Sequence, residues 1–148
     1  MAIYYSRSAR ETENIGFSLA KTVEVGSVVA LFGELGAGKT AFVRGCARGM
    51  GIDAEGTSPT FALVNEYRSG KKALYHFDMY RITGGDELYS TGYFDYLDAG
   101  ETLIIEWSEN IEAILPQDCV RVTITKCDDP DERQIEIIGA EILENISD

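Results

Sequence analysis

Hydrophobic residues recur at helical spacing near the start of the chain. Ile15, Leu19 and Val23 follow one another at four-residue steps. Ser8 and Glu11 stand ahead of them with the spacing of a capping box, in which two side chains satisfy free N–H groups at the start of a helix. The pattern therefore predicts a helix that runs to about residue 22 and buries one stripe of side chains.

A continuous apolar run follows at Val28–Phe32. A run of this length without polar alternation is typical of a strand covered on both faces, as in parallel sheets. Apolar residues then recur at helical spacing between positions 42 and 50, and Gly51 stands where a helix C-terminal cap is expected. The predicted order is strand, glycine-rich loop, helix.

The rest of the chain shows strand patterns and turn signals. Segments 61–67 and 73–80 are predicted to pair as a hairpin around residues 68–71, with apolar and polar residues alternating along the second segment. The other expected elements are a short helix over 86–90, an apolar strand over 103–105, a helix over 110–115, and a closing hairpin of 120–124 with 135–137. Parallel-type strands mixed with hairpins favour one three-layer α/β domain over residues 1–148, with a mixed sheet that has a parallel core and antiparallel hairpins.

Charge is distributed unevenly along the chain. Before position 98 there are 10 basic and 11 acidic residues, and from there on there are 3 and 14. An acidic half repels phosphate backbones, so the chain alone is expected to bind nucleic acid poorly. The acidic surface is either simply solvated or a docking face for a basic partner.

Cysteine usage and hydropathy indicate the compartment. The three cysteines form no Cys-x-x-Cys pair and their number is odd, which favours reduced thiols over disulfides. No apolar run approaches the length of a membrane span, and the first residues lack a secretory signal. A cytoplasmic protein without membrane contact is expected.

The segment Gly33-Glu-Leu-Gly-Ala-Gly-Lys39-Thr40 matches the pattern G-x-x-x-x-G-K-[ST]. Glycines let backbone N–H groups curl around a phosphate, the lysine offers a positive charge to the β and γ phosphates, and the threonine hydroxyl suits Mg²⁺. The sequence thus predicts a P-loop NTPase-like domain that uses ATP and Mg²⁺. The residues expected to line the nucleotide site here are Gly33, Glu34, Leu35, Gly36, Ala37, Gly38, Lys39, Thr40 and Ala41.

Two acids are candidates for the metal or the attacking water. Glu106 follows a fully apolar strand, so it should emerge at the carboxyl edge of the sheet beside the loop. Asp78 lies on the polar side of a strand that is expected to be half-buried. With Thr40 they could form an oxygen-rich Mg²⁺ site, although each could also be an ordinary surface acid. His76 is interpreted as structural or as an organiser of Asp78.

Ser58, Thr60 and Trp107 are further candidates. The two hydroxyls lie in an expected loop and could sense the γ-phosphate, or the segment could be a proline turn that enters a strand. The tryptophan could stack on a base or belong to the core.

These motifs together resemble the TsaE family of ATPases in bacterial tRNA threonylcarbamoyladenosine biosynthesis. The resemblance covers nearly the whole chain, and its blocks are residues 31–40, 42–45, 58–67, 76–81 and 105–107. Ser108 departs from the pattern, because proline is expected after the tryptophan. That departure could loosen the loop around Trp107.

The resemblance implies that the chain hydrolyses ATP to sustain a TsaB–TsaD complex. That complex transfers a threonylcarbamoyl group to adenosine 37 of tRNA, and the tRNA is held by the partner complex. The roles that the resemblance implies are phosphate and Mg²⁺ binding by Lys39 and Thr40, metal binding by Glu106, a second functional acid at Asp78, switch-like contacts by Ser58 and Thr60, and base contact by Trp107. The residues expected to act in catalysis are Lys39, Asp78 and Glu106.

Two other classes of nucleotide-binding protein share parts of this pattern. A small GTPase-like switch is suggested by Thr125-Lys-Cys-Asp128, which imitates a guanine-reading motif but fits a hairpin better. A small-molecule kinase usually adds an arginine-bearing lid over the phosphates. No arginine occurs between Arg81 and Arg121.

Overall fold

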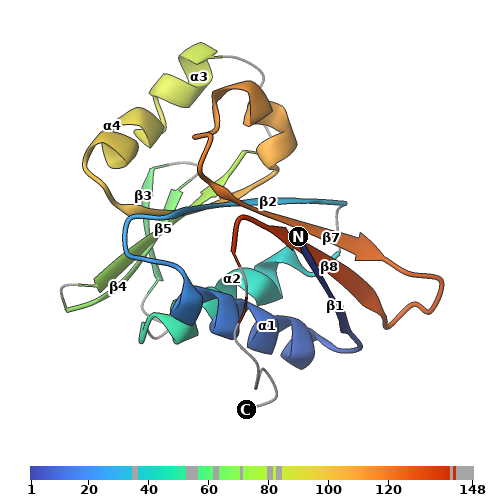
Figure 1. The fold of residues 1–148 in the computed structure, drawn as a ribbon. Helices are drawn as coiled ribbons and strands as arrows, with labels where there is room; N and C mark the ends of the chain where they lie inside the picture. Colours follow the sequence, from blue (N-terminus) through green and yellow to red (C-terminus); the bar gives the residue numbers. More distant parts are fainter. Residues whose placement is uncertain are drawn as a thin grey trace.

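The computed structural model of the 148-residue chain describes residues 1–34, 37–52, 57–61, 64–70, 72–79, 82, 85–140 and 142, of which 57–61 and 85 are described in their backbone only. The described part forms a three-layer α/β structure, with α1 and α2 on one face of a sheet and α3 and α4 on the other (Figure 1). The strands are β1 (Ala2–Ser6), β2 (Val28–Gly33), β3 (Thr57–Phe61), β4 (Val64–Ser69), β5 (Lys72–Asp78), β6 (Thr102–Glu106), β7 (Val120–Lys126) and β8 (Arg133–Ile138). The helices are α1 (Ala9–Thr22), α2 (Lys39–Gly49), α3 (Gly85–Tyr89), α4 (Tyr93–Asp98) and the 3₁₀ segment η2 (Ser108–Ile114).

The eight strands lie in the order β1-β8-β7-β2-β6-β5-β4-β3. The central strands β7, β2, β6 and β5 are parallel to one another, and antiparallel strands continue the sheet on both sides. The predicted mixed sheet is therefore confirmed. Because β2 is flanked by β7 and β6, the segment that follows β2 starts at the carboxyl edge of the parallel core.

Helix α1 begins where the sequence predicts it. The Ser8 side chain accepts a hydrogen bond from the Glu11 N–H at 3.1 Å. The Glu11 carboxylate accepts a hydrogen bond from the N–H of Arg7 at 2.9 Å, one residue earlier than in the standard capping box. The helix buries Ile15 and Leu19, and it ends at Thr22.

Helices α1 and α2 pack with their backbones almost in contact. A Cβ atom at Gly45 would lie 1.9 Å from the carbonyl oxygen of Glu13, and one at Gly16 would lie 2.4 Å from the carbonyl oxygen of Phe42. A Cβ at Gly49 would meet the carbonyl oxygen of Phe17 at 2.4 Å. Only glycine permits this approach, so these three positions fix how α2 sits on α1.

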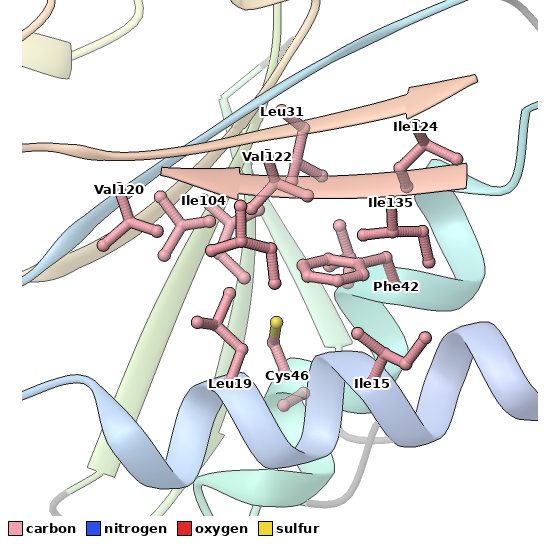
Figure 2. Packing of buried hydrophobic residues seen from close by; sticks show 14 of the residues in the cluster. Ile15, Leu19, Leu31, Phe42, Cys46, Ile104, Val120, Val122, Ile124 and Ile135 are labelled. Carbon is pink, nitrogen blue, oxygen red and sulfur yellow. The ribbon is translucent and has the colours of Figure 1, made fainter. Parts of the chain in front are cut away.

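The sheet separates two hydrophobic cores. Under α1 and α2, side chains from both helices interdigitate with alternate residues of the central strands, as Figure 2 shows for Leu19, Phe42, Cys46 and Ile104. The second core lies beneath α3, α4 and η2, and includes Phe77 and Tyr93 in an edge-to-face contact. Alternate residues of β5 and β6 thus point to opposite faces of the sheet and pack in different cores.

Several elements differ from the prediction. Strand β1 was not predicted, and it pairs with β8 at the end of the sheet. Residues 58–60, expected in a loop or in a proline turn that enters a strand, belong to β3. Strand β5 is not half-buried, because it lies between β4 and β6 and buries side chains on both faces, His76 included.

The helices and the cysteines agree with the remaining expectations. The helices expected near 86–90 and 110–115 correspond to α3 and η2, and the aromatic segment after α3 forms α4. Cys46 and Cys119 are buried free thiols, and Cys127 is a partly exposed one. In the described part of the chain, no helix is long and apolar enough to cross a membrane.

Candidate active site

Lys39 is the first residue of α2 and lies at the carboxyl edge of the parallel strands. Its ammonium donates a hydrogen bond to the carbonyl oxygen of Gly33, the last residue of β2, at 2.6 Å. The same nitrogen lies 3.7 Å from the centroid of the Trp107 ring. Gly38, which precedes the helix, has φ of 108°, so the turn into α2 requires glycine. The lysine is 5% exposed, and its side chain contacts the end of β2 and the residue that follows β6.

Burial and nearby carboxylates act in opposite directions on Lys39. Desolvation lowers the pKa of its ammonium from the ordinary value of 10.5, and the carboxylates of Glu106, Glu109 and Asp78 raise it, with burial the larger effect. All three acids are therefore close enough to act on the lysine. A buried ammonium whose charge is not fully compensated attracts a further anion, such as a phosphate.

Asp78 and Glu106 lie side by side at the ends of neighbouring parallel strands. They are paired in register between β5 and β6. Leu74 and Ile104 belong to the core beneath α1 and α2, and they have the same strand parity as the two acids. Because side chains alternate between the faces of a sheet, both acids lie on the α2 side. The prediction that Glu106 emerges at the carboxyl edge beside the loop agrees with this geometry.

His76 binds Glu106 and not Asp78. Its Nε2 lies 2.5 Å from Oε2 of Glu106, and the two residues are only 7% and 8% exposed. The interpretation of His76 as an organiser of Asp78 is thus wrong. In the parallel register His76 faces Ile104, so its ring reaches diagonally to the residue two positions further along β6.

The turn after β6 closes over the end of β2. A carboxylate oxygen of Glu109 accepts a hydrogen bond from the N–H of Gly33 at 3.0 Å. Among the described residues, Trp107 is the only non-glycine with a positive φ, at 59°. Asn110 donates to the carbonyl oxygen of Met79 at 2.7 Å and ties this turn to the end of β5. Glu109 was missed by the sequence analysis, which had no signal to link positions 33 and 109.

Ser108 does not loosen the turn. It is fully buried, and its hydroxyl donates to the carbonyl oxygen of Ile105 at 2.9 Å. The half-buried Trp107 belongs to the site and borders the apolar core. The structure places its ring on Lys39, at the phosphate-binding end of the predicted site, so contact with a base remains a prediction.

A hollow of about 270 Å³ adjoins the other side of the loop. It lies between Ala37 and Gly38, the start of α1, and the β7–β8 hairpin, and Arg7 and Arg133 are among its lining residues. Arg133 donates from Nε to the carbonyl oxygen of Ala37 at 3.1 Å, which fastens the hairpin to the loop. Neither arginine was singled out from the sequence, because both lie outside the recognised motifs.

Three other residues predicted to bind the nucleotide lie in α2 or just after β2. Thr40 is exposed on its first turn beside the half-buried Ala41, and Glu34 is exposed just after β2. Leu35 and Gly36 lie outside the described residues. Ser58 and Thr60 are described only in their backbone, within β3.

The donor chemistry of the site fits Mg²⁺. Glu106 and Asp78 offer carboxylate oxygens and Thr40 a hydroxyl, the hard oxygen ligands that this ion prefers. Within the described ranges, no three His, Cys, Asp or Glu side chains gather as a metal-binding cluster. Mg²⁺ needs no such cluster, because it keeps several waters and takes one or two protein ligands beside substrate phosphates.

Comparison with known proteins agrees with the fold. Over 96% of this chain and 86% of the other, the structure superimposes on the crystal structure of YdiB from Bacillus subtilis with a TM-score of 0.73 and 34% identity. The protein therefore has an α/β fold of the P-loop NTPase-like class. Residues 6–135 match the family model described as threonylcarbamoyl adenosine biosynthesis protein TsaE. The chain belongs to the TsaE family.

Individual relatives agree with that assignment. The tRNA threonylcarbamoyladenosine biosynthesis protein TsaE of Treponema pallidum is 40% identical over 119 residues, which cover 80% of this chain and 87% of the relative. The proteins of the same name from Haemophilus influenzae and Bacillus subtilis are 43% and 40% identical, over 76% and 84% of this chain and 70% and 77% of the relatives. The predicted family resemblance is confirmed.

Proposed function

We propose that this protein is a single-domain, cytoplasmic, Mg²⁺-dependent ATPase that sustains threonylcarbamoyl modification of adenosine 37 in tRNA, together with a TsaB–TsaD complex. The observation that carries the proposal is the buried Lys39 ammonium at the start of α2, beside the carboxyl ends of β2, β5 and β6. Membership of a family named for tRNA threonylcarbamoyladenosine biosynthesis supports the pathway.

The site supports a division of roles in ATP binding. Lys39 would release Gly33 and Trp107 and bind the β and γ phosphates, with backbone N–H groups at the start of α2 binding the same oligophosphate. The hollow beside Ala37 and Gly38 leaves room for the nucleoside end, and Arg7 and Arg133 supply positive charge there. Trp107 would have to leave Lys39 to contact a base.

The acids would act at the γ-phosphate end. Thr40 and Glu106 would hold Mg²⁺, which neutralises charge that develops on the phosphates during transfer. Asp78, beside Glu106 in register, would orient the attacking water. Ser58 and Thr60 would respond to the γ-phosphate as a switch segment does.

Acidity supports an indirect contact with tRNA. With a net charge of −12 the chain repels nucleic acid backbones, so the partner complex would hold the tRNA. The protein would contribute ATP binding and turnover to that complex.

The test has a biochemical arm and a cellular arm. Purified protein is titrated with ATP with and without Mg²⁺, with GTP as competitor, and release of inorganic phosphate is measured with and without a TsaB–TsaD complex. In cells depleted of their own TsaE-type protein, the chain should restore the modified adenosine and its Lys39→Ala variant should not. Equal binding of GTP would favour a GTPase-like switch, and phosphate appearing on a metabolite would favour a kinase.

A further inference from the structure

His76 and Glu106 form a buried polar pair between β5 and β6. Nε2 of the histidine lies 2.5 Å from Oε2 of the glutamate, and both residues are more than nine-tenths buried. Since a carboxylate only accepts hydrogen bonds, Nε2 carries the proton. This bond occupies one carboxylate oxygen and restricts the rotamer of the glutamate.

The second ring nitrogen shows that the pair is not arranged for stability alone. Among the buried side-chain nitrogen and oxygen atoms of the described residues, Nδ1 of His76 is the one without a hydrogen-bond partner. A buried unsatisfied nitrogen costs free energy, and replacing both members of a buried polar pair by well-packed apolar residues of similar volume is often neutral or stabilising. The neighbouring positions Leu74 and Ile104 are apolar on the same face. Apolar residues at positions 76 and 106 together would therefore suit the core at least as well.

The location of the pair gives it a use. Glu106 acts on Lys39, its strand neighbour is Asp78, and the next residue in the chain is Trp107, which contacts Lys39. Carboxylates that bind a metal are themselves commonly held by hydrogen bonds from a second group, which sets their direction. His76 has the donor, the distance and the burial for that task.

We propose that His76 is a positioning residue, which holds Oε2 of Glu106 so that the other carboxylate oxygen faces the Mg²⁺–nucleotide. This inference rests on the proposed function of the site. His76 acts only through Glu106, and it touches neither nucleotide nor metal. Its loss should weaken the metal's contribution to nucleotide binding and leave metal-free binding of ATP intact.

The test compares three variants by calorimetric titration with ATP. His76→Gln keeps an N–H donor in nearly the position of Nε2, His76→Leu removes the donor, and Glu106→Gln removes the charge that the histidine positions. The readout is the ratio of the Kd values for ATP without and with Mg²⁺. We expect His76→Leu to reduce this ratio by about 10- to 100-fold. We expect His76→Gln to retain most of it, and ATP binding without metal to stay within about twofold of wild type in both.

A double-mutant cycle separates positioning from a structural role. If His76 acts through Glu106, adding His76→Leu to Glu106→Gln causes no further loss, because interacting sites are not additive. Additive losses, or a wild-type ratio in His76→Leu, would overturn the inference. Thermal unfolding of each variant is followed in parallel, and His76→Phe, which fills the ring volume without a donor, replaces His76→Leu if the latter unfolds.

The outcomes also separate this inference from the proposed function. A wild-type protein that binds no ATP, or binds it without any effect of Mg²⁺, would overturn the function and the inference together. A wild-type protein with a clear Mg²⁺ effect that His76→Leu leaves intact would overturn the inference alone.

Discussion

The Lys39 ammonium lies 3.7 Å from the centroid of the Trp107 ring, and both residues are at the carboxyl edge of the central parallel strands. A cation over an indole face is stabilised by the ring quadrupole, by roughly 1 to 2 kcal/mol when partly desolvated. The protein's single tryptophan is therefore in contact with the lysine that we propose binds phosphate.

The first prediction uses that contact as an optical probe. Saturating ATP with Mg²⁺ should change the intrinsic fluorescence of Trp107, because the ammonium must leave the ring to bind phosphate. Lys39→Met should change the spectrum of the nucleotide-free protein and abolish the response to ATP. An unchanged spectrum in both experiments would contradict the movement of Lys39.

A second prediction concerns affinity and pH in the Lys39→Met variant. Loss of a charged contact with phosphate should weaken ATP binding by about 10- to 100-fold, measured by calorimetry, with an unchanged far-ultraviolet circular dichroism spectrum.

Burial lowers the pKa of Lys39, so at low pH this lysine is protonated in both the folded and the unfolded chain, and the folded state bears the full desolvation cost. As the pH rises through the folded-state pKa towards 10.5, that cost disappears. The unfolding free energy of wild type should therefore rise relative to Lys39→Met over this range in urea titrations.

A third prediction concerns Glu106 in turnover. Glu106→Gln should lower Mg²⁺-dependent phosphate release by at least about 10-fold while the protein remains folded. Glu112→Gln is the matched control, because this glutamate is exposed and pairs with Arg121 away from Lys39. Equal rates in the two variants would exclude Glu106 from the metal site.

A fourth prediction tests the contact between α1 and α2. Gly45→Ala should lower the free energy of unfolding by about 3 kcal/mol, because its Cβ would lie 1.9 Å from the carbonyl oxygen of Glu13. Gly100→Ala is the comparison: nothing lies within 4 Å of its Cβ, but φ of 73° makes it cost about 1 kcal/mol. Chemical denaturation of both proteins gives the difference. Similar denaturation midpoints for the two variants would contradict the close backbone contact between α1 and α2 at Gly45.

A fifth prediction concerns thiol reactivity. The pKa of all three cysteine thiols is raised, by burial first of all, so access to the sulfur decides which thiol reacts first. Iodoacetamide should therefore modify the native protein first at Cys127, the partly exposed thiol, and reach Cys46 only after unfolding. Mass spectrometry of peptides from timed reactions identifies the site, and early labelling at Cys46 would contradict the packing of α2.

The sequence predicted the elements that depend on local pattern. The apolar run of β2, the helices on either side of it, and the position of Glu106 at the end of β6 all follow from short-range periodicity. The glycine-rich loop could be recognised because its motif is contiguous.

What the sequence missed depends on partners far along the chain. The bond from Gly33 to Glu109 joins residues 76 apart, and that from His76 to Glu106 joins residues 30 apart. No periodicity encodes such pairs, because they depend on strand order and register. Strand β1 was missed for a related reason, since it is a short edge strand whose partner β8 lies more than 100 residues further along the chain.

The glycine contact between α1 and α2 has a consequence for how this molecule could respond to a ligand. At the three glycines, main-chain atoms of α2 face main-chain atoms of α1, and no rotamer change at those points could make room for α2 to rotate or slide on α1. The first turn of α2, which carries Lys39 and Thr40, is then expected to keep its position relative to α1. Any rearrangement during a nucleotide cycle would then occur on the other side of the site, in the turn from Trp107 to Asn110. This turn is anchored mainly by hydrogen bonds, which can exchange.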